Sequence, residues 1–198
     1  MSTVPVVPPL KARVIEQRAL TFLKEHSPNV FSQNKPTPVD RFFEFTIPNN
    51  LGMNTYYTSL QSFGIDAEGY TNARQKVSIV DQRLADDFSE RGRRRFRATV
   101  GHEIGHCMLH ASLRRWQLSL QIVGKGMKRE RSDLEAFEDP EWQAWRYCHA
   151  LCMPEPSVRG MVEKYGVGES GVRALMERFD VNRTFVQARL RMLKIIPR

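Results

Sequence analysis

The pentapeptide His102-Glu103-Ile104-Gly105-His106 lies in the second half of a stretch, residues 90–111, whose apolar side chains recur about every 3.6 residues. We therefore predict one helix over this stretch. The apolar side chains would form a single buried stripe made of Phe96, Val100, Ile104, Cys107, Met108 and Ala111. The two histidines lie outside that stripe, so we expect their side of the helix to be free for a role other than packing.

Two histidines four positions apart lie on one helical face, about 6 Å apart, so both imidazoles can reach a single metal ion. Glu103 follows His102 at about 100° around the helix, beside that ion without being forced to coordinate it. We predict that His102 and His106 bind zinc and that Glu103 acts as the general base. The competing interpretation is an ordinary helix that carries two surface histidines.

A catalytic zinc ion needs a third protein ligand and leaves a fourth position to water. The pair Asp139-Pro140 is typical of a helix start, with the aspartate as cap and the proline as first residue, and predicts a helix that continues to Met153. Glu141 lies in its first turn, where a side chain projects beyond the helix start toward a neighbouring helix. We therefore expect Glu141 to be the third ligand.

Other residues could compete with Glu141 for that role. Three acidic residues nearby in the sequence are rivals, although the last of them is better explained as the helix cap: Glu135, Glu138 and Asp139. His110 continues the histidine series, but it lies about 12 Å along the helix axis from His102, which is too far for one ion. We expect His110 behind the ligands or at the rim of the site, with an ordinary solvated histidine as the alternative.

The remaining elements predict an α+β fold. A first amphipathic helix is expected over residues 10–26. Aromatic and β-branched residues mixed with Gly and Asn turns predict three short strands, near Phe43–Ile47, Tyr56–Leu60 and Lys76–Val80. The last of these strands could offer an edge to an extended peptide, or be purely structural. Two further helices are expected near Gly168–Phe179 and Arg183–Leu193.

Two motifs in the same order, His102–His106 and the segment from Glu141 to Pro154, resemble those of the ImmA/IrrE metallopeptidases. An Arg/Phe-rich lead-in at residues 93–99 and the tripeptide at 179–181 extend the resemblance to about residues 11–194. It implies a zincin-like α+β fold, in which a small, mostly antiparallel or mixed sheet packs on the active-site helix and a helical C-terminal part follows. It also implies that Glu141 is the third zinc ligand and Glu103 the general base.

The resemblance implies a zinc metallo-endopeptidase whose substrate is a specific protein, typically a helix-turn-helix repressor of a mobile element or stress response. The expected cofactor is Zn²⁺, and Mn²⁺ accepts the same histidine and carboxylate ligands. The sequence departs from the family pattern where members often carry Asp or Asn, at Trp145, and where they carry small residues, at Cys148 and His149. A missing carboxylate behind a ligand histidine weakens metal binding about 10- to 100-fold, unless His149, Asp139 or a backbone carbonyl replaces it.

We expect three parts: a flexible N-terminal tail (1–9), a metallopeptidase domain (10–165) and a C-terminal helical hairpin (166–198) with the proportions of a helix-turn-helix. The net charge is +8, and five arginines cluster before the motif: Arg91, Arg93, Arg94, Arg95 and Arg97. The C-terminal helices are basic as well, and a phosphate backbone would be attracted to both regions. The alternative function is therefore a DNA-binding or regulatory protein on a degenerate zincin scaffold, or weak DNA contact by a peptidase.

The composition, with 41% hydrophobic and 26% charged residues, is that of a globular protein. No apolar run approaches the roughly 18 residues that a membrane span needs, and the N-terminus lacks the features of a secretion signal. Three cysteines, Cys107, Cys148 and Cys152, are typical of a reducing compartment and are expected to pack as small apolar residues, with a redox role for Cys107 as the alternative. We expect a cytoplasmic protein that does not contact membranes.

Overall fold

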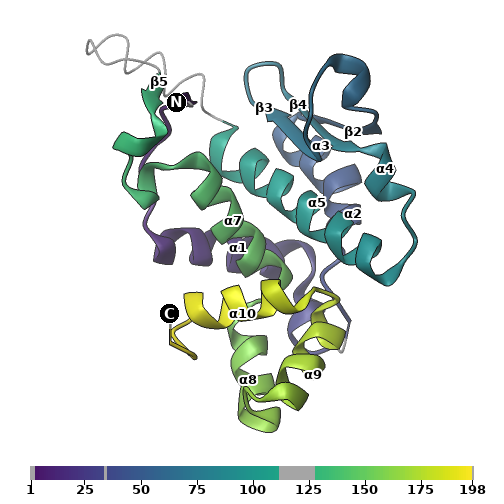
Figure 1. The fold of residues 1–198 in the computed structure, drawn as a ribbon, viewed down its shortest axis with the longest axis vertical. Helices are drawn as coiled ribbons and strands as arrows, with labels where there is room; N and C mark the ends of the chain where they lie inside the picture. The colour runs from purple at the N-terminus through teal and green to yellow at the C-terminus, as the bar shows by residue number, and fades with distance from the viewer. Residues whose placement is uncertain (1–2, 34, 112–127, 198) are drawn as a thin grey trace.

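The computed structural model describes residues 3–33, 35–111 and 128–197, with short strands and helices arranged around helix α5 (Figure 1). The strands are β1 (Thr3–Pro5), β2 (Asn54–Thr58), β3 (Gly69–Asn72), β4 (Val77–Asp81) and β5 (Lys128–Glu130). The helices are α1 (Ala12–His26), α2 (Val39–Arg41), α3 (Ile47–Leu51), α4 (Gln82–Ala85), α5 (Glu90–His110), α7 (Pro140–Cys152), α8 (Glu155–Tyr165), α9 (Glu169–Phe179) and α10 (Arg183–Met192). None of the described helices combines the length and apolar character needed to cross a bilayer. The predicted α+β class is confirmed.

A mixed three-stranded sheet lies along one side of α5 (Figure 1). Its central strand, β4, is parallel to β2 and antiparallel to β3, with Ile79 opposite Tyr56 on one side and Tyr70 on the other. The strands predicted near 56–60 and 76–80 are confirmed as β2 and β4, whereas β3 was not predicted. Because β4 is paired on both sides, the suggestion that it offers a free edge to a peptide is wrong.

The strand predicted at Phe43–Ile47 is also wrong. The segment is helical, since α2, a π-helical turn (Phe42–Thr46) and α3 follow one another without a break. Its buried residues share the spacing of one helical face: Val39, Phe42, Phe43 and Ile47. Helical periodicity, rather than aromatic and β-branched composition, therefore determines the structure of this segment.

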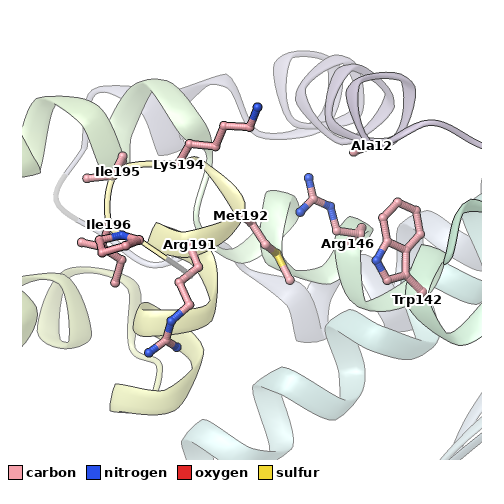
Figure 2. A pocket seen from close by; sticks show the side chains of 9 residues that line it. Ala12, Trp142, Arg146, Arg191, Met192, Lys194, Ile195 and Ile196 are labelled. Carbon is pink, nitrogen blue, oxygen red and sulfur yellow. The ribbon is translucent and has the colours of Figure 1, made fainter.

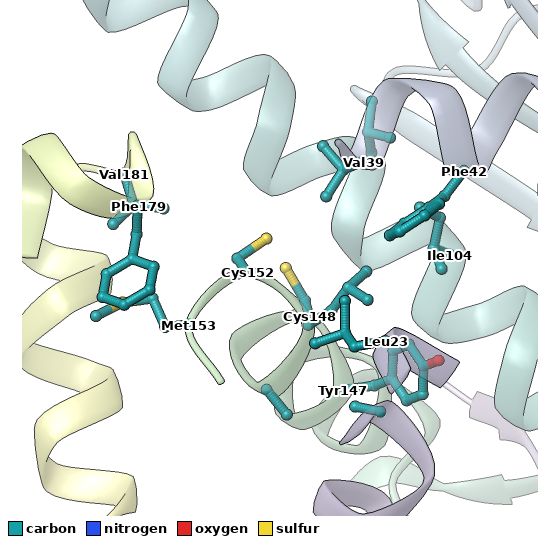
Figure 3. Packing of buried hydrophobic residues seen from close by; sticks show 14 of the residues in the cluster. Leu23, Val39, Phe42, Ile104, Tyr147, Cys148, Cys152, Met153, Phe179 and Val181 are labelled. Atoms are coloured by element: carbon teal, nitrogen blue, oxygen red, sulfur yellow. The ribbon is translucent and has the colours of Figure 1, made fainter. Parts of the chain in front are cut away.

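The core lies where α5, α7 and α1 pack together. Figure 3 shows Cys148 and Cys152 of α7 within this core, near Leu23 of α1 and Ile104 of α5. All three cysteines are free and fully buried, so the prediction that they pack as small apolar residues is confirmed. Burial raises the pKa of Cys107 to about 12, which keeps its thiol protonated and argues against a redox role.

Helices α9 and α10 form the predicted C-terminal hairpin, preceded by α8, which was not predicted. Arg189 of α10 is fully buried, pairs with Glu16 of α1 and donates from Nε to the carbonyl oxygen of Met153 at the end of α7 (2.8 Å). One buried arginine thus connects α10 to both α1 and α7. The division of the chain into domains at residues 165 and 166 stays a prediction.

The described part of the N-terminal segment is ordered by contacts with the chain that precedes α7. Strand β1 pairs antiparallel with β5, and the amide of Leu10 donates to the carbonyl oxygen of Phe137 (2.8 Å). Val7 is only 3% exposed. Residues 3–9 therefore lie against the rest of the protein, and the division that makes residues 1–9 a flexible tail stays a prediction.

Candidate metal centre

Two glycines let α5 and α7 approach each other closely. A Cβ atom at Gly105 would lie 2.7 Å from the carbonyl oxygen of Ala144, and one at Gly101 would lie 2.9 Å from Cys148 Sγ. The Asp139 carboxylate accepts a hydrogen bond from the amide of Glu141 (2.9 Å), which confirms the predicted cap. The close approach and this helix start together place the first turn of α7 opposite the histidines of α5.

The three predicted ligands, His102, His106 and Glu141, lie together. His102 Nε2 is 3.1 Å from Glu141 Oε2 and 3.0 Å from His106 Nε2, which is itself 3.3 Å from Glu141 Oε1. In a tetrahedral zinc site with bonds of about 2.0–2.1 Å, ligand atoms are about 3.3–3.4 Å apart. Two imidazole nitrogens and a carboxylate at these separations therefore fit a divalent metal such as zinc. The Glu141 side chain is 40% exposed, so the group opens to solvent on that side.

Glu103 lies beside this group, on the side of α5 that faces the sheet. It is 4% exposed, and its Oε2 accepts a hydrogen bond from Thr71 Oγ1 of β3 (2.5 Å), while Thr71 Oγ1 also lies 2.7 Å from Ser78 Oγ. A Cβ atom at Gly69 would collide with the Glu103 carboxylate, so β3 passes directly against it. Burial raises the pKa of Glu103, which favours proton uptake by this carboxylate.

The polar side of α5 is therefore largely buried as well, although its side chains form the candidate metal centre and not the apolar core. His102 is 8% exposed and Glu103 is 4% exposed. Contacts with His102 and then His106 lower the pKa of the Glu141 carboxyl. Burial lowers the pKa of His106, but the contact with Glu141 and the negative charges of Glu103, Glu141 and Asp139 together outweigh it, so the pKa of His106 is raised. Glu141 is consequently held in the ionised form that binds a cation.

His110 lies behind His106 and away from the three clustered ligand atoms. The two Nδ1 atoms are 3.1 Å apart, and His110 Nε2 lies 3.0 Å from Gln143 Oε1. Gln143 Nε2 in turn donates to the carbonyl oxygens of Pro8 (2.9 Å) and Phe137 (2.8 Å). Burial, with His106 beside it, lowers the pKa of His110 to about 3, so its ring is neutral near pH 7.

Behind His102, no carboxylate of the described residues stands where Trp145 departs from the family pattern. The Trp145 indole packs against the His102 imidazole instead, with ring centroids 4.4 Å apart and 38° between the planes. His102 Nδ1 is buried and has no hydrogen-bond partner among the described residues. His149 stacks on Phe185 of α10 (3.8 Å between centroids), and Asp139 caps α7. The two histidines of the group therefore differ in what supports them.

The rival acidic residues have other contacts. Glu135 and Glu138 form the capping box of a short 3-10 helix, Ala136–Glu138. The Glu135 amide donates to Glu138 Oε2 (3.2 Å), and the Glu135 side chain accepts from the Glu138 amide. Asp139 accepts a hydrogen bond from Arg131 Nη2 (2.9 Å) as well as capping α7. Among the residues that the structure describes, one group of His, Cys, Asp and Glu could hold a metal ion: His102, His106 and Glu141.

Several arginines that motivated the DNA alternative have partners within the protein. Arg93, Arg94 and Arg97 all contact the Asp180 carboxylate, at 2.8, 3.4 and 3.6 Å. Asp180 adopts a left-handed conformation (φ 50°) in the turn between α9 and α10, and Arg183 of α10 pairs with an acidic residue of α9. The pairs with Asp180 hold the C-terminal hairpin against the start of α5, and the Arg183 pair joins the two helices of the hairpin to each other.

A cavity of about 890 Å³ lies where α7 meets α10 and the residues after it, and it contains none of the three clustered metal-binding residues. Figure 2 shows Trp142 and Arg146 of α7 on one side of it and Arg191 and Lys194 on the other. No acidic residue is among the described residues that line it. Arg191 and Lys194 are exposed, so an anion could reach them.

Three residues at the site were not singled out from the sequence: Gly69, Thr71 and Gln143. The first two belong to β3, a strand whose residues are all half-buried and which therefore shows no alternation. Gln143 did leave a signal. It interrupts an otherwise apolar stripe on α7 made of Pro140, Ala144, Tyr147, Cys148 and Leu151. A polar residue in such a stripe indicates a buried hydrogen-bonding role.

The sequence matches the family profile Peptidase_M78, described as the IrrE N-terminal-like domain, over residues 49–191. The matched region contains α5 and α7, and with them both parts of the candidate metal centre. No curated protein matches the sequence.

Proposed function

The chain belongs to the Peptidase_M78 family of IrrE N-terminal-like domains, and from that premise we propose that it is a zinc-dependent endopeptidase acting on a specific protein. Family membership supports a metallopeptidase-like function. The observation that carries the finer proposal is the convergence of His102, His106 and Glu141 beside the buried carboxylate of Glu103. Zinc suits this donor set, and Mn²⁺ is the alternative ion with the same ligands.

Zinc held by His102, His106 and Glu141 would supply Lewis acidity, which makes water a good nucleophile near neutral pH and polarises a peptide carbonyl. Glu103 accepts the proton of the attacking water and delivers it to the leaving amine. Thr71 orients this carboxylate by donating to Oε2. The raised pKa of Glu103 suits a group that must both gain and release a proton.

Strand β3 offers a place for an extended substrate. Among the described strands it pairs with β4 alone, and its Thr71 is hydrogen-bonded to Glu103. A peptide added to the free edge of β3 would pass the proposed catalytic carboxylate, with main-chain hydrogen bonds providing affinity. We propose that the substrate is a helix-turn-helix repressor of a mobile element or stress response, the class that the family resemblance suggests.

Metal content and cleavage test this proposal in separate steps. We expect about one zinc ion per chain in the wild type and its loss in His106→Ala and Glu141→Ala. Glu103→Gln should keep the metal and lose cleavage by at least about 100-fold. The matched control is His149→Gln, which removes a buried histidine of α7 that stacks on Phe185 and should leave the metal content unchanged.

Cleavage is measured by mass spectrometry of repressor proteins incubated with the purified enzyme. Zinc retained at full occupancy by Glu141→Ala would remove Glu141 from the ligand set. Cleavage by Glu103→Gln at the wild-type rate would refute the assignment of the base.

Duplex DNA is a second candidate partner, for a peptidase or for a regulatory protein on this scaffold. The basic cavity supports it, because exposed Arg191 and Lys194 lie there without an acidic lining residue among those described. Binding through phosphates weakens steeply with salt. We expect Arg191→Gln and Lys194→Gln each to reduce, by about 1, the slope of the logarithm of the DNA-binding constant against the logarithm of the salt concentration. Arg93→Gln, whose guanidinium pairs with Asp180, is the control that should not change it. Absence of DNA retention at low salt would refute this candidate.

We also propose a cytoplasmic location. The support is that Cys107, Cys148 and Cys152 are all free and buried, as suits a reducing compartment. Fractionation of cells that express the tagged full chain tests it, and recovery in a secreted or membrane fraction would contradict it.

A further inference from the structure

The orientation of the Gln143 side-chain amide is determined by two backbone carbonyls. Its Nε2 lies 2.9 Å from the carbonyl oxygen of Pro8 and 2.8 Å from that of Phe137. Carbonyl oxygens can only accept, so the NH₂ group of Gln143 must face them and Oε1 must face His110. Gln143 is completely buried, which leaves the amide no solvent-exposed alternative.

This orientation determines which nitrogen of His110 carries hydrogen. Because Gln143 Oε1 can only accept, His110 Nε2, 3.0 Å away, must be the donor. With one hydrogen on the ring, the lone pair of His110 lies on Nδ1, 3.1 Å from His106 Nδ1. His106 Nδ1 must therefore donate. His106 consequently carries hydrogen on Nδ1 and presents Nε2 to His102 and Glu141.

We propose that Gln143 and His110 are positioning residues that hold His106 in the tautomer that a metal ligand requires. The inference rests on the metal centre of the proposed function. A histidine that binds metal through Nε2 must carry its hydrogen on Nδ1, and the partner of Nδ1 selects that form. The chain from the Pro8 and Phe137 carbonyls through Gln143 and His110, here called the His106 relay, makes this selection before any metal arrives.

The His106 relay begins partly outside the matched family region, which starts at residue 49. Pro8 lies in the N-terminal segment, and the β1–β5 pairing and the Leu10 amide hold that segment beside the chain before α7. Two segments far apart in the sequence thus supply the two carbonyls that orient Gln143. In this chain the N-terminal segment is part of the support of the metal centre.

The two histidine ligands are supported unequally. His102 Nδ1 has no partner among the described residues and its ring packs against Trp145, whereas His106 Nδ1 is hydrogen-bonded within the relay. The orientation of His106 is therefore the one that hydrogen bonds control. Substitutions in the relay should weaken metal binding even though no relay residue other than His106 touches the metal.

Zinc affinity, measured by competition with a chromophoric chelator, tests the relay. Gln143→Met keeps the side-chain length without the amide, and His110→Phe keeps a ring without nitrogens. Each should weaken zinc binding about 10- to 100-fold. The double variant should bind zinc no more weakly than His110→Phe, because Gln143 acts through His110. His149→Phe replaces another buried histidine that contacts no ligand, and it should keep wild-type affinity.

Nuclear magnetic resonance of ¹⁵N-labelled imidazoles reports the tautomers directly in the metal-free full chain at mildly alkaline pH. We expect hydrogen on Nδ1 of His106 and on Nε2 of His110, and mixed tautomers of His110 in Gln143→Met. Thermal melts of the metal-free variants identify any that fail to fold.

Wild-type zinc affinity in folded Gln143→Met, or hydrogen on Nε2 of neutral His106 in the wild type, would overturn the relay. A further loss of affinity when Gln143→Met is added to His110→Phe would show that Gln143 acts by another route. If the wild type binds no zinc, the proposed function fails, while the tautomers of the metal-free protein still decide whether the relay exists.

Discussion

Gly105→Ala tests whether close packing of α5 and α7 builds the metal centre. The added Cβ would lie 2.7 Å from the carbonyl oxygen of Ala144 and 3.0 Å from its Cα, inside the 3.4 Å at which ordinary contact begins. Both are backbone atoms and cannot rotate aside, so the helices must separate. Overpacking of this kind costs about 1–3 kcal/mol, offset by about 1 kcal/mol because alanine favours a helix over glycine. We expect a net loss of up to about 2 kcal/mol in the free energy of unfolding.

Gly160→Ala in α8 is the matched control for this substitution. A Cβ atom there would meet no heavy atom within 4 Å, so the same change should stabilise the protein by about 0.5–1 kcal/mol. Denaturant unfolding measures both effects, and in a chain of this size each kcal/mol corresponds to about 2–4 °C in Tm.

Zinc affinity is the second readout, because separation of the helices moves Glu141 away from His102 and His106. Gly105→Ala should lose affinity and Gly160→Ala should not. A Gly105→Ala protein that is as stable as the wild type and binds zinc as tightly would refute the argument that Gly105 sets the ligand distances.

Three further predictions concern the surroundings of the site. Trp145→Asp should tighten zinc binding about 10-fold, because a carboxylate would give His102 Nδ1 an acceptor; unchanged affinity in chelator competition would contradict this. Asp81→Asn should lower the free energy of unfolding by about 1–2 kcal/mol at neutral pH, because the carboxylate caps α4 and accepts from the Leu60 amide and from Arg83. Since the Arg83 hydrogen bond lowers the pKa of Asp81 to about 2, the difference from the wild type should be full above about pH 4 and shrink as the pH falls toward about 2; a difference independent of pH would count against it. Cys107 should react with a thiol reagent only on unfolding, since burial raises its pKa to about 12, and fast labelling of the native protein would show otherwise.

The motif helix and the third ligand could be predicted because the signals that specify them are local. Two histidines one turn apart must share a face of whatever helix carries them. Asp139 and Pro140 define a helix start from their own chemistry, and that start determines where Glu141 points. None of these inferences needs knowledge of which other element lies opposite.

The features that were missed depend on contacts between distant segments. Residues 3–10 contact residues 128–130 and the Phe137 carbonyl, and no local pattern encodes these contacts. Strand β3 has a uniform half-buried pattern because one face meets α5 and the other is partly open. At residues 39–47 a local signal did exist, since the buried positions have helical spacing, but the aromatic composition favoured a strand and led to the wrong prediction.

The burial of the polar side of α5 explains why local patterns locate the ligands but not their supports. A helix packed on all sides can retain polar side chains only if tertiary partners satisfy them. Glu103 has Thr71 from the sheet, and His106 has Glu141 and His110. His102 Nδ1 is the exception, because it is buried without a hydrogen-bond partner among the described residues. Its ring packs against Trp145, the residue at which the sequence departs from the family pattern. Since each partner comes from a different element, the chemistry of the site depends on the assembled fold as much as on the five-residue motif that reveals it.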